Sequence, residues 1–129
     1  MNELNETQLA QFRAQLDAQQ AQVRSLIDTI FQTSSHASHH LAAKKLSRLT
    51  TDDLIEFAVK IENPNLKENI EILKKIDASL VSIELGMYGF CSDCEGELII
   101  SDLEKVPTTQ RCRSCETKYQ KQRNNNYRL

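Results

Sequence analysis

The chain of 129 residues contains no tryptophan, only three glycines and two prolines, and aromatic residues make up 5% of it. Few aromatic side chains are a poor basis for a thick globular core, and few glycines and prolines leave long stretches without turns. No apolar run approaches the roughly 20 residues of a transmembrane helix, so we expect no membrane segment. This composition suits long helices that bury narrow stripes of leucine and isoleucine.

The net charge, the catalytic motifs that are missing and the first residues of the chain argue against further classes of protein function. The formal net charge is −2, which argues against general nucleic-acid binding by the whole protein. A Ser-His-Asp set, a nucleophile elbow and a glycine-rich phosphate loop are all absent from the sequence, so it offers no catalytic residues of these kinds. The first ten residues, MNELNETQLA, lack the basic and apolar segments of a secretory signal. We therefore expect a cytoplasmic protein with reduced thiols.

All four cysteines lie near the C-terminus in two pairs, with the spacing C-x2-C-x17-C-x2-C: Cys91, Cys94, Cys112 and Cys115. Each C-x-x-C turn brings two thiolates to one ion, and two such turns complete a tetrahedral shell of sulfur. The spacing therefore predicts one structural Zn²⁺ held by these four residues. Four thiolates leave no open position for water, which argues against a catalytic zinc.

The same cysteines allow other chemistry. Two disulfides would need an oxidising compartment, and a thioredoxin-like redox pair would need a C-x-x-C beside a βαβ pattern, which the sequence does not show. Iron–sulfur ligation is a further alternative. Structural zinc is the interpretation that the spacing favours.

Two long segments carry apolar residues at heptad spacing. The first segment starts near Glu6, with two sets three residues apart: Leu9, Leu16, Val23, Ile30 and Ala37, then Phe12, Gln19, Leu26, Thr33 and His40. The second repeats the pattern with Leu66, Leu73, Leu80 and Met87, then Ile76 and Ile83, with Ile70 beside them. Two helices with one stripe each are expected to pair as a long antiparallel hairpin, a coiled coil.

The hairpin is expected to turn near residues 46–56. Thr50-Thr51-Asp52-Asp53 is typical of a helix N-terminus, with a threonine cap and carboxylates at the positive end of the dipole. Asn63-Pro64 is a second helix start. Because an interior proline removes a backbone hydrogen bond, we expect either one helix kinked at Pro64, or a short helix at 52–62 followed by a longer one at 64–87.

The rest of the chain, residues 88–129, is predicted to form a C4 zinc-finger module with a C-terminal helix and tail. We expect a β-like run at residues 97–100, a turn at 107–109, a helix after Cys115 to about Arg123 and a frayed tail at 124–126. The domain organisation is therefore a helical hairpin at 1–87 and a zinc module at 88–129, and the fold class is mainly α.

Three motifs and their order carry a resemblance to a known family. They are Y-G-F-C-S-D-C at residues 88–94, L-E-K-V-P-T at 103–108 and C-R-S-C at 112–115, after a helical hairpin whose residues 9–13 read L-A-Q-F-R. This arrangement resembles the DksA/TraR family of C4-type zinc-finger proteins. The similarity covers most of the chain and is most specific over residues 87–115.

The resemblance implies a function. Members of the family bind bacterial RNA polymerase, insert the hairpin through the secondary channel and bring an acidic tip near the active site, where they modulate transcription initiation. They are not enzymes and do not read DNA sequence. By resemblance we expect RNA polymerase as partner, no direct sequence-specific DNA binding, and a monomer, since the heptads pair within one chain.

Two departures from the family pattern bear on this function. The family tip carries Asp-x-x-Asp-x-Ala, or Asp-x-x-Ala in shorter members, whereas residues 49–58 read L-T-T-D-D-L-I-E-F-A. Asp52 and Asp53 are the candidates for the acidic tip, with the alternative that they only favour a helix N-terminus.

The second departure concerns ppGpp. Where the family's best-known member has basic residues for a ppGpp site, this chain has Glu71, Val106 and Glu116, and only Lys75 stays basic. Carboxylates repel a pyrophosphate, so we expect this site to be missing.

A second function class stays open. A zinc-ribbon adaptor could bind another protein or nucleic acid through its coil and its basic tail, since residues 111–129 hold six Lys or Arg and one Glu. In that case the heptads would pair between chains and give a dimer. His36, His39 and His40 could form a second metal site, but exposed polar helix residues are the commoner reading.

Overall fold

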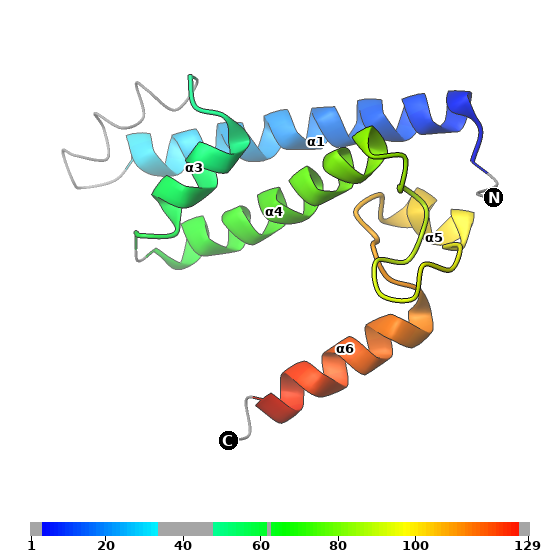
Figure 1. Ribbon diagram of the computed structural model, residues 1–129. Coiled ribbons are helices and arrows are strands. Elements are labelled where there is room, and N and C mark those ends of the chain that lie inside the picture. Colours follow the sequence, from blue (N-terminus) through cyan, green and yellow to red (C-terminus); the bar gives the residue numbers. More distant parts are fainter. Residues whose placement is uncertain (1–3, 34–47, 62, 127–129) are drawn as a thin grey trace. The chain divides into compact units, whose positions relative to one another are not determined.

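The computed structural model describes residues 4–33, 48–61 and 63–126, with side chains through Asn124. In these ranges the chain forms five helices: α1 (Glu6–Gln32), α3 (Thr51–Ala58), α4 (Pro64–Glu84), α5 (Ile100–Lys105) and α6 (Arg113–Asn126) (Figure 1). The β-structure within them is a single antiparallel bridge between Phe90 and Glu97. The expected mainly helical class is confirmed. Among the described helices, none is long and apolar enough to cross a membrane.

The chain divides into two compact units. The hairpin unit comprises Leu16–Ala78, and the cysteine unit comprises Met1–Gln15 together with Ser79–Leu129. Each of the two long helices, α1 and α4, contributes residues to both units. These units are not the expected domains, whose single boundary lay after residue 87. The expected division into domains stays a prediction.

In the hairpin unit, the later part of α1 and the early part of α4 run in opposite directions (Figure 1). Each buries one side, and α3 adds two buried residues to the same core. The buried apolar residues are Leu16, Val23, Ile27, Phe31, Leu54, Ala58, Leu66, Ile70, Leu73 and Ile76. Burying a leucine or isoleucine side chain is worth about 1.5–3 kcal/mol, so this seam supplies the main stabilising force of the unit. The expected pairing of two apolar stripes is therefore confirmed.

The stripe on α1 departs from a strict heptad. Leu26 was expected in it, but 48% of Leu26 is exposed, whereas Ile27 and Phe31 are fully buried. A straight helix has 3.6 residues per turn, so its buried side drifts away from a repeat of seven. Because of this drift, Phe31 lies on the side of α1 that packs against α3, and the centre of its ring is 5.8 Å from that of Phe57. The assignment of Leu26 to the stripe was wrong for this reason.

The return of the chain is broken at Pro64, as expected. Thr50 caps α3 by accepting a hydrogen bond from the Asp53 N–H at 3.1 Å. α3 ends at Ala58, earlier than the expected 62, and α4 starts at Pro64. Asn63 caps α4, because its Oδ1 accepts the N–H groups of Asn65 and Leu66 at 3.0 and 3.2 Å. The first part of the expected turn, residues 46 and 47, lies outside the described residues, as do Ala37 and the three histidines.

Side chains of α1 fix the start of α3. Arg24 donates through Nη2 to the Leu49 carbonyl at 2.7 Å and through Nη1 to Thr51 Oγ1 at 3.2 Å. Gln20 donates to the same hydroxyl at 3.0 Å. These part-buried bonds join residues far apart in sequence, so they hold the first turn of α3, with Asp52 and Asp53, against α1.

In the cysteine unit, the last turn of α4 ends at glycine. Gly86 has φ +72°, a conformation that disfavours other residues, and the N–H of Met87 donates to the Ser82 carbonyl at 2.8 Å. The helix therefore stops at Glu84, and Met87, which was expected in the stripe, is 52% exposed.

Two further expectations in this unit need correction. The segment expected to be β-like makes one bridge at Glu97 and then starts α5 at Ile100, a helix that sequence analysis missed. α6 continues through Asn126, so the backbone at 124–126 is helical rather than a frayed tail.

Candidate metal centre

A buried tyrosine sets the loop that leads to the first cysteine pair. Tyr88 is 4% exposed, and its hydroxyl donates to the Pro107 carbonyl at 2.7 Å. Its ring lies 5.6 Å from that of Phe12, tilted by 48°. Burial raises the pKa of Tyr88 well above its ordinary value, so the hydroxyl stays protonated as a donor. Tyr88 thus joins α1, the first cysteine loop and the turn after α5.

The first cysteine pair forms a tight turn, which we call the first knuckle (residues 91–94). The N–H of Cys94 points back at Cys91 Sγ at 3.5 Å. The N–H of Cys91 donates to the Gly96 carbonyl at 2.7 Å, and Glu95 takes φ +63° to close the turn. The reversal brings both sulfurs of the pair to the same side.

The second knuckle (residues 112–115) lies at the start of α6. It repeats the geometry, with the N–H of Cys115 at 3.5 Å from Cys112 Sγ. The N–H of Glu116 donates to the Cys112 carbonyl at 2.9 Å and begins the helix. One backbone bond links the two knuckle segments, from the Ser92 N–H to the Gln110 carbonyl at 2.7 Å.

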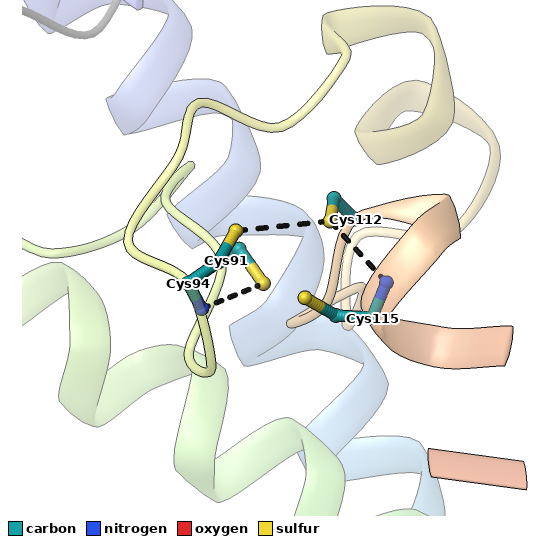
Figure 2. A group of neighbouring side chains, drawn as sticks. All are labelled: Cys91, Cys94, Cys112 and Cys115. Atoms are coloured by element: carbon teal, nitrogen blue, oxygen red, sulfur yellow. Dashed lines mark hydrogen bonds between the residues drawn. The ribbon is translucent and has the colours of Figure 1, made fainter. Parts of the chain in front are cut away.

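The four sulfur atoms converge (Figure 2). All lie within 4.8 Å of one another, and Cys94 Sγ and Cys112 Sγ, from different knuckles, are 3.8 Å apart. All four are free thiols; Cys91 is buried, Cys94 is exposed, and the other two are half-buried. A zinc–sulfur bond of about 2.3 Å gives a tetrahedral edge of about 3.8 Å, so the donor set fits one tetrahedral ion. A disulfide would need its sulfurs at about 2.05 Å.

The thiols do not hold their protons equally. Burial raises the pKa of the Cys91 thiol, but hydrogen bonds from backbone N–H groups, foremost that of Cys94, outweigh burial and lower this pKa to about 6. The neighbouring Cys112 thiol raises the pKa of Cys115 to about 12. Binding of a metal ion by these four residues would require them as thiolates, so it would release the protons that the thiols hold.

The other candidate site residues lie elsewhere. Asp52 and Asp53 are exposed in the first turn of α3, in the hairpin unit, and within the described residues they belong to no group of metal-ligating side chains. Sequence analysis did not anticipate the charged pairs around the cysteines. Arg113 makes a two-bond ion pair with Asp102 at 2.9 and 3.1 Å, which lowers the pKa of that carboxyl. The opposite charges beside each knuckle were visible in the sequence, but their pairing depends on the fold.

Known proteins resemble this chain in sequence and in fold. The RNA polymerase-binding transcription factor DksA of Escherichia coli strain K12 is 31% identical over 116 residues, which cover 88% of this chain and 72% of that protein. This chain belongs to the DksA family. The DksA of Haemophilus influenzae is 28% identical, with 88% of this chain and 75% of that protein covered. No family model matches the chain.

Solved structures support the fold of this DksA-family chain. Transcription factor DksA2 from Pseudomonas aeruginosa superposes with a TM-score of 0.59 at 20% identity, covering 93% of this chain and 88% of that one. The RNA polymerase binding protein and transcriptional regulator Dks from Chlamydia trachomatis gives a TM-score of 0.55 at 20% identity, covering 92% and 93%. The family resemblance noted from the motifs is confirmed, and the expected fold class with it.

Replacing Tyr88 by phenylalanine tests the role of its hydroxyl. The change leaves the buried Pro107 carbonyl without its donor, which should destabilise the cysteine unit by about 1–2 kcal/mol. Hydrogen–deuterium exchange of residues 88–110 should then become about 5- to 30-fold faster. Tyr119→Phe is the matched control, because within the described residues the Tyr119 hydroxyl makes no hydrogen bond. Equal exchange in both variants would contradict the assignment.

Proposed function

We propose that this chain is a non-enzymatic transcription regulator that binds bacterial RNA polymerase in the cytoplasm. The observation that carries the proposal is the 31% identity over 116 residues to a factor named for that binding. The four-cysteine cluster supports it, because it lies in the segment where the motifs resemble the family most closely. We expect the regulator to act as a monomer and without reading DNA sequence.

The metal we propose is one structural Zn²⁺ held by Cys91, Cys94, Cys112 and Cys115. When bound, zinc supplies cross-linking rather than reactivity, since four thiolates fill its coordination shell. The cysteine unit has few buried apolar residues of its own, so metal binding would supply much of its folding free energy.

For the hairpin, we propose entry into the secondary channel, with Asp52 and Asp53 brought near the polymerase active site to modulate initiation. Both carboxylates are exposed, and their helix is fixed by the Thr50 cap and by Arg24. Asp52 and Asp53 can favour the N-terminus of α3 and also face a partner, because they lie in the first turn of this helix and are exposed.

We further propose that the family's ppGpp site is missing here. Glu71 is exposed and pairs with Lys74 at 3.3 Å, and Val106 is 52% exposed. Glu116 accepts the Gln120 amide at 2.8 Å and lies 3.9 Å from Arg111. Adding this protein to polymerase should therefore not increase the binding of labelled ppGpp. An increase that depends on the protein would overturn this point.

The decisive experiment is a titration of the full chain against RNA polymerase core in competition with a known secondary-channel factor. Mutual exclusion is expected. Binding without competition would refute the channel placement, and no binding at micromolar concentrations would favour the zinc-ribbon adaptor.

A second assay, which measures how long promoter complexes of the polymerase last, separates the role of the tip from binding itself. Asp52→Asn with Asp53→Asn should remove the effect on promoter-complex lifetime, while the dissociation constant from polymerase stays within about threefold. Glu56→Gln, another exposed acid on α3, is the matched control and should keep the effect. If the control and the double variant behave alike, the two aspartates do not form the acidic tip.

A further inference from the structure

Arg111 joins the two halves of the cysteine cluster. It immediately precedes Cys112, and its Nε donates to Asp93 Oδ2 at 3.0 Å. Asp93 lies inside the first knuckle, between Cys91 and Cys94. The Arg111 side chain is 27% exposed and that of Asp93 47%. This ion pair therefore ties the segment that enters the second knuckle to the turn of the first.

The same guanidinium also contacts α6. Its carbon lies 4.0 Å from the centre of the Tyr119 ring, a cation–π contact. Its Nη1 lies 3.9 Å from Glu116 Oε2, and Glu116 follows Cys115 directly. One side chain thus touches the first knuckle and the first two turns of the helix that carries the second. An arginine suits this position because its planar group can pair and stack at once.

The need for such a contact follows from the chain. Seventeen residues separate Cys94 from Cys112, so the two pairs of sulfurs approach through a long loop. Thiolates brought together repel one another, and ordering them costs free energy that the metal must offset. Apart from the sulfur atoms themselves, the knuckle segments are also joined by the backbone bond from Ser92 to Gln110, at 2.7 Å.

We propose that Arg111 is a positioning residue for the cysteine cluster: it fastens the first knuckle to α6 and so holds the four sulfurs ready for the metal. The inference rests on the proposed zinc site. It also gives Glu116 a structural role, since the carboxylate found where the family's ppGpp contact would be lies 3.9 Å from Arg111. Groups around metal ligands commonly change metal affinity by 10- to 100-fold.

Arg113 provides a matched control. It lies two residues further on and is also ion-paired, through two bonds to Asp102. Asp102 belongs to α5, so this pair joins α6 to α5 and leaves the first knuckle untouched. Removing Arg113 deletes the same charge close to the same cysteines without opening the contact between the knuckles.

The test is the zinc dissociation constant of the full chain, measured by competition with a chromogenic chelator. Arg111→Met should weaken zinc binding by about 10-fold with unchanged helix content by circular dichroism. Arg113→Met should stay within about threefold of the wild type. Asp93→Asn should weaken binding too, and combining it with Arg111→Met should add little, since both remove one contact.

Three results would overturn the role of Arg111. They are a loss below about threefold in Arg111→Met, an equal loss in Arg113→Met, and additive losses for Arg111→Met and Asp93→Asn. If Arg111→Met does not fold, Asp93→Asn keeps the arginine and decides the question by the same threshold. Failure of the wild-type chain to bind zinc would refute the metal site itself, which is a separate and distinguishable outcome.

Discussion

The convergence of four sulfur atoms is the constraint on which the cysteine unit depends. The buried apolar side chains of this unit in the described residues are few: Leu4, Phe12, Tyr88, Cys91, Leu98 and Leu103. Such a core is too small to order several loops and two short helices by burial alone. The cluster, the Tyr88–Pro107 bond and the Arg111–Asp93 pair act at the points where these loops must meet. In this unit, contacts between loops supply the stability that a larger apolar core supplies in other domains.

The hairpin unit is held by different physics. Its stability comes from a continuous apolar seam along α1, α3 and α4, with polar contacts added at the start of α3. A narrow seam suits a long element that keeps most of its surface for solvent or a partner. The hydrogen bonds of Arg24 fix the first turn of α3 within this unit. The exposed carboxylates of that turn, Asp52 and Asp53, therefore start from a fixed backbone.

Local patterns in the sequence predicted most of the elements. The C-x-x-C pairs predicted the cluster because each turn is defined by four neighbouring residues, and Asn63-Pro64 predicted the break because cap and proline act within one turn. Features that depend on packing were missed. Leu26 was placed in the seam although Ile27 and Phe31 are the residues buried there, and α5 was missed because Ile99 and Ile100 favour a strand.

The charged contacts of Arg111 and Arg113 were also missed, since the sequence shows charges but not their partners. Once the fold is known, they explain why acidic residues stand next to the cysteines and at Glu116.

X-ray absorption at the metal edge of the purified full chain, together with a metal count, tests the central claim most directly. We predict one zinc ion per chain with four sulfur neighbours at about 2.3 Å. A shell that mixes nitrogen or oxygen with sulfur, a different metal, or a chain without metal whose cysteines form disulfides would contradict the account.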